Sequence, residues 1–321
     1  MSLAADRAAE GAVGPVRARR PRLSKRRRQE AGWFYLFVSP WIVGFLVFQF
    51  GPMLSSLYFS MTDWDSFTPP KWVGLDNYKT LLTKDPVFWK SLWNTVYYAG
   101  LSVPLGLIIG LWLANLLNKQ IRARKIFRTL IYLPVLVPLV ATAMIFKIVL
   151  APSGPLNEGL GIFGIKGPPW LLTETWIKPA LVLLSVWAAG GATVLLLAAM
   201  KGIPRELYEA AEVDGAGPIR QFWSITVPQL TPIIFFNLVM GLIAAFQMFS
   251  QTYVLAPANQ RGGPNYASET TVLYLFDHAF GFYHMGYASA LSWLLFLVIL
   301  GFTILAFRTA RRWVFYETEV K

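Results

Sequence analysis

Six apolar runs, each long enough to cross a lipid bilayer, constrain the fold of this 321-residue chain more than any other feature. The hydrocarbon core of a bilayer is about 30 Å thick and needs about 20 helical residues to cross it. Because a helix satisfies its backbone polar groups within one segment, each run predicts a transmembrane helix. The predicted spans are residues 33–59, 91–118, 129–150, 179–200, 225–255 and 285–307.

Composition indicates the same class, an all-α membrane protein. Hydrophobic residues make up 55% of the chain and charged residues only 14%, whereas a soluble domain carries roughly 25% charged residues. The chain has no cysteine, which excludes disulfides, thiolate metal sites and cysteine nucleophiles. With only two histidines, His278 and His284, we predict neither a metal site nor a catalytic residue.

The distribution of lysine and arginine predicts how the chain is oriented. Residues 1–32 carry nine of them, residues 119–128 five, residues 201–224 three and residues 308–321 four, whereas the three intervening loops together hold seven. Lys147 lies near the end of the third span, where its long side chain is expected to reach the membrane surface. Loops rich in Lys and Arg stay in the cytoplasm. We therefore expect both termini and residues 201–224 to be cytoplasmic.

The first 32 residues are predicted to form a basic tail that is disordered up to about Arg28, because Pro, Arg and Ala dominate and little can be buried. The apolar run behind this tail is too long for a signal peptide. A nucleic-acid patch is one interpretation. We favour a basic flank held near anionic lipid headgroups, and predict no nucleic-acid partner. The membrane domain is predicted at residues 33–313, with a second short tail at residues 314–321.

Residues 201–224 form a charged segment between two predicted spans. Pro204 suits the first turn of a helix, where its missing N–H has no partner to lose. Gly215 and Gly217 are predicted to end that helix, and Pro218 to begin a second one. So many charged side chains cannot lie in hydrocarbon, so this helix–turn–helix segment must project from the membrane.

The positions of the acidic residues limit what could supply energy to this chain. All 17 lie outside the predicted spans. Proton-driven transporters usually need a carboxylate or histidine within the membrane, so that class is disfavoured. Sodium sites made of backbone carbonyl groups remain open. No G-x-x-x-x-G-K-[ST] phosphate loop occurs. The pattern predicts that a partner protein supplies the energy.

The spacing within the charged segment matches a known motif. Glu209-Ala210-Ala211 is followed after three residues by Gly215, after nine more by Ile225 and after two more by Pro228. This spacing resembles the EAA loop of binding-protein-dependent ABC importer permeases, which docks into the ATPase subunit. The match runs from about residue 33 to residue 313, with a longer segment after Ala256 than is usual. Other matches to the carbohydrate (maltose and glycerol-3-phosphate) type are residues 72–78, 88–89, 94–95, 246–250, 253–255 and 262–264.

This resemblance implies the type I importer permease fold in the cytoplasmic membrane of a bacterium or archaeon. It implies a heterodimer with a second homologous permease, two ATPase subunits that bind ATP and Mg²⁺, and an extracytoplasmic solute-binding protein. The chain itself would hold no cofactor and would not be an enzyme; it would pass a carbohydrate by alternating access. The residues implied to couple it to the ATPase are Arg205, Glu206, Glu209, Ala210, Ala211, Asp214, Gly215, Arg220 and Phe222.

Candidate substrate contacts lie in the fourth and fifth spans, where the family has its contacts. Sugars hydrogen-bond through hydroxyl groups and stack on aromatic rings, so polar and aromatic residues are the candidates. Gln247 and Gln251 are four residues apart and are predicted to share one helical face. The alternative to a substrate contact is hydrogen bonding between helices for the polar candidates. For Gly190 and Gly191 it is close packing of helices. The candidates are Trp187, Gly190, Gly191, Asn237, Gln247, Ser250, Gln251 and Tyr253.

Other functions are disfavoured. A membrane-embedded enzyme would need a polar constellation, and only His278 with Asp277 and His284 offers one. A secondary sugar transporter should carry inverted repeats or coupling residues in its spans. A di- or oligosaccharide is favoured over a glycerol-3-phosphate-type substrate, because no Lys or Arg lies in mid-span to meet a phosphate. Parts of residues 61–90 and 262–264 are candidates for docking the external binding protein.

Overall fold

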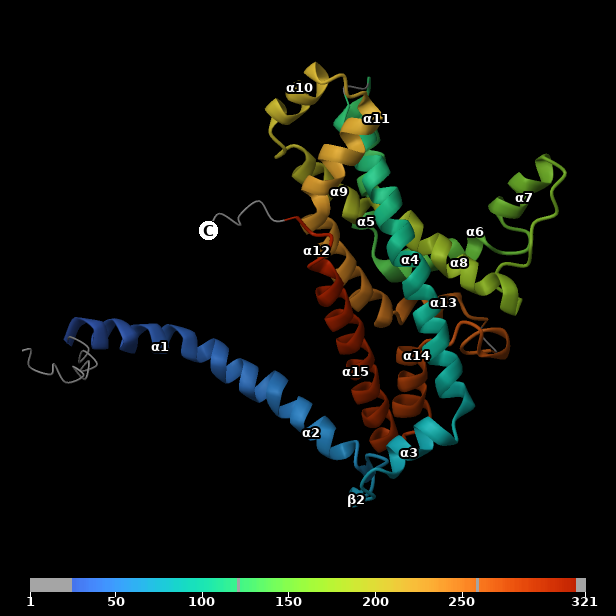
Figure 1. Ribbon diagram of the computed structural model, residues 1–321. Helices are drawn as coiled ribbons and strands as arrows, with labels where there is room; N and C mark the ends of the chain where they lie inside the picture. The colour runs from blue at the N-terminus through green and yellow to red at the C-terminus, as the bar shows by residue number, and fades with distance from the viewer. Residues whose placement is uncertain (1–24, 120–121, 258–259, 316–321) are drawn as a thin grey trace, which may run out of the picture. The chain divides into compact units, whose positions relative to one another are not determined.

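The computed structural model describes residues 25–119, 122–257 and 260–315 (Figure 1). The chain divides into two compact units, residues 1–55 and 56–321, and each is described by itself. Within the described residues, five helices are long and apolar enough to span a membrane, or six if one bent pair counts as a single span. This agrees with the predicted six-span, all-α class.

The first unit is helical from its first described residue. Helix α1 (Lys25–Phe45) continues through a π-helical turn (Leu46–Phe50) into α2 (Gly51–Phe59), whose last residues belong to the second unit. Residues 25–28, which were predicted to be disordered, are therefore helical, and the membrane-domain boundary at residue 33 stays a prediction. Lys, Arg, Gln and Glu are good helix formers, and Arg26 pairs with Glu30 one turn away at 3.3 Å. The rest of the predicted tail lies outside the described residues.

Four long spans form the frame of the second unit, and each of them extends beyond one of its predicted ends. Helix α4 (Pro86–Asn118) begins where the Asp85 carboxylate accepts the N–H groups of Val87 and Phe88, both at 3.0 Å. The other spans are α8 and α9 (Glu174–Trp187 and Gly190–Met200), α11 and α12 (Pro218–Gln221 and Val227–Phe246, joined by a π-helical turn) and α15 (Met285–Ala310). Helix α4 contacts α8, α9 and α12 among these spans.

The third predicted span is bent rather than straight. Helix α5 (Arg124–Leu136) and helix α6 (Leu139–Val149) meet at 102°. Pro138 stands at the bend with extended backbone angles, and a proline there removes a helical N–H donor. The predicted span over residues 129–150 is therefore helical in both halves and bent at Pro138, and whether it crosses the membrane as one span stays a prediction.

The fifth predicted span is also interrupted. Helix α12 ends at Phe246, and the short helix α13 (Ser250–Leu255) begins after Phe249, whose φ and ψ are −131° and −61°. The hydroxyl group of Thr270 donates to the Met248 carbonyl at 2.9 Å, so a tertiary contact replaces a helical hydrogen bond at this break. Gln247 and Gln251 consequently do not share one helical face, which corrects the prediction from their spacing.

Shorter elements connect the spans. Figure 1 shows α10 (Arg205–Val213) and α11 at one end of the second unit and α3 (Asp76–Thr83) at the other. The remaining short elements are the antiparallel strands β1 (Thr62–Asp63) and β2 (Lys71–Trp72), α7 (Pro155–Ile162), and α14 (Thr271–Phe276) with the π-helical turn Asp277–Gly281.

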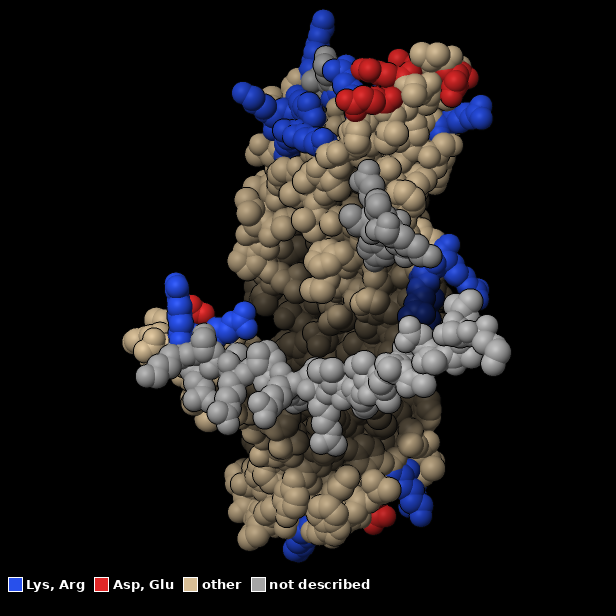
Figure 2. All heavy atoms as spheres, turned by 60° about the vertical axis from the view of Figure 1, so that its left-hand side comes forward, with Lys and Arg blue, Asp and Glu red and all other residues tan. Residues whose placement is uncertain are grey.

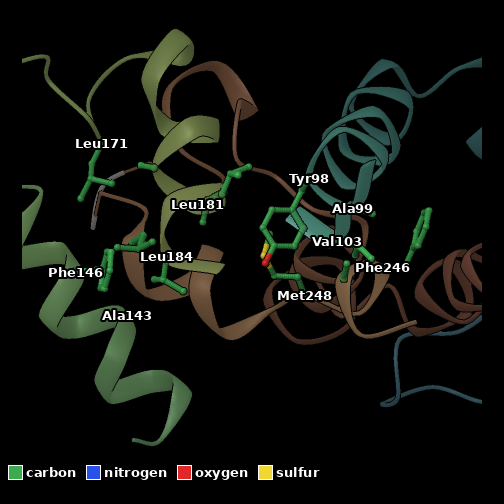
Figure 3. Close-up of a cluster of buried hydrophobic side chains, with 14 of the residues drawn as sticks. Tyr98, Ala99, Val103, Ala143, Phe146, Leu171, Leu181, Leu184, Phe246 and Met248 are labelled. Atoms are coloured by element: carbon green, nitrogen blue, oxygen red, sulfur yellow. The ribbon is translucent and has the colours of Figure 1, made fainter. Parts of the chain in front are cut away.

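The largest buried cluster joins α4, α6, α8 and the end of α12. Figure 3 shows Tyr98 and Ala99 from α4, Phe146 from α6, Leu184 from α8 and Phe246 from α12 within it. Lipid tails are as apolar as these side chains, so helix association in a membrane depends on close packing rather than on exclusion of water. Small residues at contacts therefore determine how closely the spans approach.

Gly190 shows this dependence, and Gly191 provides a matched control. A Cβ atom on Gly190 would overlap the Ile131 carbonyl oxygen of α5, whereas a Cβ on Gly191 would meet nothing within 4 Å. We expect Gly190→Ala to overpack this contact and destabilise the protein by about 1–3 kcal/mol. Thermal unfolding in detergent should show a lower Tm for Gly190→Ala and little change for Gly191→Ala. Equal Tm values would contradict close packing of α5 on α9.

Candidate functional site

A cavity of about 340 Å³ lies where α12 is interrupted. Residues of α4, α8, α9, α12 and α13 line it, together with Ala188 and Ala189 between α8 and α9 and Met248 at the break. Among the described residues, none of those lining it is charged. Its polar side chains are Tyr98, Ser102, Ser185, Asn237 and Gln251. The cavity can therefore offer hydrogen bonds to an uncharged, hydroxyl-bearing ligand.

Two of the predicted substrate contacts line this cavity. Asn237 extends from α12, and its Nδ2 donates to the Ile233 carbonyl at 2.8 Å. Gln251 lies in the first turn of α13. That amide donation leaves the Asn237 side-chain oxygen available as an acceptor. The break in α12 thus places an amide from each side of the interruption on one cavity.

The other predicted contacts lie elsewhere. Trp187 and Tyr253 are exposed, with the Trp187 ring 6.0 Å from that of Phe146 and the Tyr253 ring 5.8 Å from that of Phe276. Gly190 packs against α5. Residues predicted as substrate contacts that do not line the cavity are Trp187, Gly190, Gly191, Gln247, Ser250 and Tyr253.

Three cavity residues were missed by the sequence analysis: Tyr98, Ser102 and Ser185. Ser102 and Ser185 are side-chain partners of the Tyr98 hydroxyl group. Figure 3 shows the Tyr98 ring with its hydroxyl oxygen beside Met248. Tyr98 and Ser102 are four residues apart on α4, so their spacing on one helical face was the available signal. Ser185 gave no such signal, because only the fold brings α8 beside α4.

Lys147 has a role that its place in the sequence did not predict. Its Nζ donates to the carbonyl oxygens of Val254 at 2.8 Å and Ala256 at 3.2 Å. These carbonyl groups lie at the C-terminal end of α13, where helical partners are lacking. Lys147 therefore caps α13 from α6, which connects the bent third span to the segment that carries Gln251.

The charged helix pair at the other end of the spans consists of α10 and α11. Pro204 precedes α10 with φ −57° and ψ 135°, so it lies before the helix rather than in its first turn as predicted. Gly215 has φ +77°, and the N–H of Ala216 donates to Ala211 at 2.8 Å, which closes the helix end as expected for a glycine there. The Tyr208 hydroxyl group lies 2.8 Å from that of Thr226 and ties α10 to the following span.

Exposure is common to most of the predicted coupling residues. The Arg205 and Glu209 side chains form an exposed pair at 3.9 Å, as their spacing predicts. Figure 2 shows acidic side chains gathered at the end formed by this helix pair. Ala211 and Phe222 are partly buried, and Phe222 packs against the cluster around Leu230. The exposed members are Arg205, Glu206, Glu209, Ala210, Asp214, Gly215 and Arg220.

The opposite end of the second unit carries a cluster of ionisable groups around Asp85. Burial opposes ionisation there, but hydrogen bonds from the hydroxyl groups of Tyr274 (2.6 Å) and Tyr287 hold the pKa of Asp85 below its usual value. Burial lowers the pKa of His278 to about 4. Asp277 pairs with Arg261 at 3.1 Å. Within the described residues, no three ligand side chains are placed to hold a metal ion.

Glu269 is the most deeply buried carboxyl group of this end, with 1% of its surface exposed. Burial, reinforced by the charge of Asp277, raises its pKa to about 8. The folded chain therefore retains a proton that the unfolded chain loses near pH 4.5. Stability from this group is complete below about pH 4.5 and is lost as the pH rises through about 8.

We expect Glu269→Gln to remove this pH dependence, because the amide stays neutral at every pH. The Tm at pH 8.5 should rise above that of the parent by a few degrees, at about 2–4 °C per kcal/mol. Differential scanning fluorimetry from pH 5 to pH 9 measures the effect. The exposed Glu158 provides a control, since Glu158→Gln should leave the profile unchanged. A parent Tm that did not fall towards pH 9 would contradict this account.

The interrupted spans, the uncharged cavity and the charged helix pair define the class of this chain, a multi-pass membrane transport protein. Comparison with known proteins then identifies the family. Residues 106–313 match the family described as binding-protein-dependent transport system inner membrane component, and the chain belongs to this family. The predicted family is confirmed.

Known relatives agree over nearly the whole chain. A probable ABC transporter permease of Bacillus subtilis (strain 168), YesP, is 42% identical over 287 residues, 89% of this chain and 92% of that protein. The lactose transport system permease LacF of Rhizobium radiobacter is 34% identical over 89% of this chain and 96% of its own length. The solved structure of a bacterial ABC transporter that imports the acidic polysaccharide alginate matches with TM-score 0.78 and 26% identity, covering 89% and 98% of the two chains. The fold is that of a type I ABC importer permease, as predicted.

Proposed function

We propose that this chain forms part of the path through which an ABC importer moves a neutral di- or oligosaccharide into the cytoplasm. The uncharged cavity at the break in α12 carries this proposal, because it presents hydroxyl and amide groups. A few well-placed polar groups in an otherwise apolar site are typical of ligand recognition. The lactose permease relative supports a sugar as the substrate class.

The cavity also favours a neutral sugar over an acidic one. Phosphate and carboxylate groups are usually met by Arg or Lys, and no residue lining the cavity within the described chain carries a charge. The related transporter of the acidic polysaccharide alginate handles a charged ligand. We therefore expect this chain to differ from it in substrate charge. A glycerol-3-phosphate permease is also among the relatives, but the described residues that line the cavity offer no cation to meet a phosphate group.

Substitutions of Gln251 and Gln247 form a matched pair that tests whether the cavity is the substrate path. Gln251 lines the cavity, whereas Gln247 does not. Gln251→Leu removes a hydrogen-bonding amide that contributes about 1 kcal/mol or more. We expect sugar uptake by the assembled transporter to fall about fivefold or more with Gln251→Leu and to change less than twofold with Gln247→Leu. Equal losses would contradict the cavity as the substrate path.

Energy in this proposal comes from two ATPase subunits that hold ATP and Mg²⁺ and bind α10 and α11. Support comes from the exposed charged side chains of this helix pair and from the match to the EAA spacing. The proposed transporter also contains a second homologous permease and an external binding protein. Both termini lie in the cytoplasm on this proposal, because the lysine- and arginine-rich segments alternate along the chain.

A movement of α10 and α11 can be transmitted to the cavity through one continuous helical span. Residues Pro218–Phe246 form a 29-residue span that begins at α11 and ends at the break. At about 1.5 Å per residue, this rod is roughly 44 Å long. A tilt of the helix pair would therefore move the end of α12 relative to α13, which Lys147 holds to α6. This is the route we propose for alternating access.

Gly215 tests the coupling role. Its φ of +77° is strained for any side chain, whereas Gly217 has φ −69° and open space where a Cβ atom would lie. We expect Gly215→Val to abolish transport and sugar-stimulated ATPase activity of the assembled transporter, with normal amounts of chain in the membrane. Gly217→Ala should retain most activity. Full activity of Gly215→Val would show that α10 and α11 do not couple the subunits.

A further inference from the structure

A second cavity, of about 620 Å³, lies away from the membrane cavity already described. It is enclosed by the loop before α14, the π-helical turn after α14 and the first residues of α4. These elements lie towards the end of the second unit opposite α10 and α11, which the proposed topology places outside the cell. A volume of this size can accept a small ligand.

Aromatic and polar side chains line this cavity together. The rings of Tyr266 and Phe282 are 46% and 59% exposed. Arg261 and Asp277 line the cavity as an ion pair at 3.1 Å, so their charges offset each other while both can still hydrogen-bond. Asn265 adds an amide. Exposed rings beside paired charges suit a neutral ligand with both apolar C–H faces and hydroxyl groups.

The backbone at this cavity is strained. Asn265 and Tyr266 both have positive φ, 48° and 54°, although neither is glycine. The Asn94 side chain donates to the Tyr266 carbonyl at 2.8 Å and to that of Glu269 at 2.9 Å, and so holds the loop in place from α4. Strained residues that the surroundings hold in place tend to lie at ligand sites. Here the strain positions the Tyr266 ring at the cavity.

The loop also lies next to the membrane cavity. Glu269 lines the outer cavity, and the hydroxyl of its neighbour Thr270 donates to the Met248 carbonyl, whose residue lines the membrane cavity. A small space of about 10 Å³ shares Tyr98 and Met248 with the membrane cavity and is also lined by Ser268 and Thr270 of this loop.

We propose that the outer cavity is a second sugar-binding site of this chain, where one ring of a neutral oligosaccharide stacks on Tyr266 before it reaches the membrane cavity. This inference rests on the proposed function for the substrate class. Arg261, Asp277 and Asn265 bond the hydroxyl groups of the sugar. Burial keeps Glu269 uncharged near neutral pH, which leaves the site without net charge.

Saturation-transfer NMR on the full chain in nanodiscs tests the site directly. The probes are lactose, maltotriose and arabinotriose, with an alginate trisaccharide as the charged comparison. We expect saturation transfer to at least one neutral sugar, and a loss of fivefold or more in Tyr266→Ala. Tyr266→Phe keeps the ring and should retain the signal, as should Trp72→Ala, which removes an exposed ring outside the cavity.

Several results would overturn the inference. These are the absence of signal from every neutral sugar, an unchanged signal in Tyr266→Ala, or loss of the signal in Gln251→Leu alone, which would assign binding to the membrane cavity. If Tyr266→Ala instead weakens only the binding of the external binding protein, the cavity is a docking surface and the inference is wrong. Sugar uptake by the assembled transporter tests the proposed function separately, because uptake without outer-site binding would leave that function standing.

Discussion

The interruption between α12 and α13 determines most of what this structure can do. A broken helix in hydrocarbon leaves backbone carbonyl groups without partners, and such groups are tolerated only where other parts of the protein satisfy them. Here Thr270 donates to the Met248 carbonyl, and Lys147 donates to the carbonyls of Val254 and Ala256. Thr270 thus stabilises the break itself, and Lys147 caps the far end of the short helix α13 that follows it. Because the break is stabilised, an uncharged cavity can exist beside it.

The same contacts connect the proposed functional parts. The loop before α14 is held to α4 by Asn94, and Thr95 of the same helix lies 3.2 Å from the Thr271 hydroxyl. From this loop, Thr270 reaches the break, and α12 runs from the break to the charged helix pair. A change at either end would therefore alter the hydrogen bonds that stabilise the interruption. These hydrogen bonds therefore link the loop before α14 to the charged helix pair through α12.

Much of the fold followed from the sequence, because length, apolarity and charge act locally. The six-span class, the turn at Gly215 and the Arg205–Glu209 pair all depend on residues close together in the chain. The break near Met248 and the capping role of Lys147 depend on contacts between distant segments, which spacing alone does not reveal. The bend at Pro138 instead has a local cause, the proline itself. The residues of the candidate substrate site differ in the same respect: some could be predicted from the sequence and others could not. Asn237 and Gln251 reach the cavity, whereas Gln247 lies beyond the helix end and Ser185 joins through tertiary packing.

The central claim is that the charged helix pair faces the cytoplasm and receives the ATPase. The chain has no cysteine, so a single introduced one can be labelled without background. Val213 in α10 is 89% exposed, and Phe67 between β1 and β2 is also exposed. With a membrane-impermeant maleimide, Val213→Cys should be labelled only in inside-out vesicles and be protected by bound ATPase, whereas Phe67→Cys should be labelled only in intact cells. Labelling of Val213→Cys from outside intact cells would contradict the account.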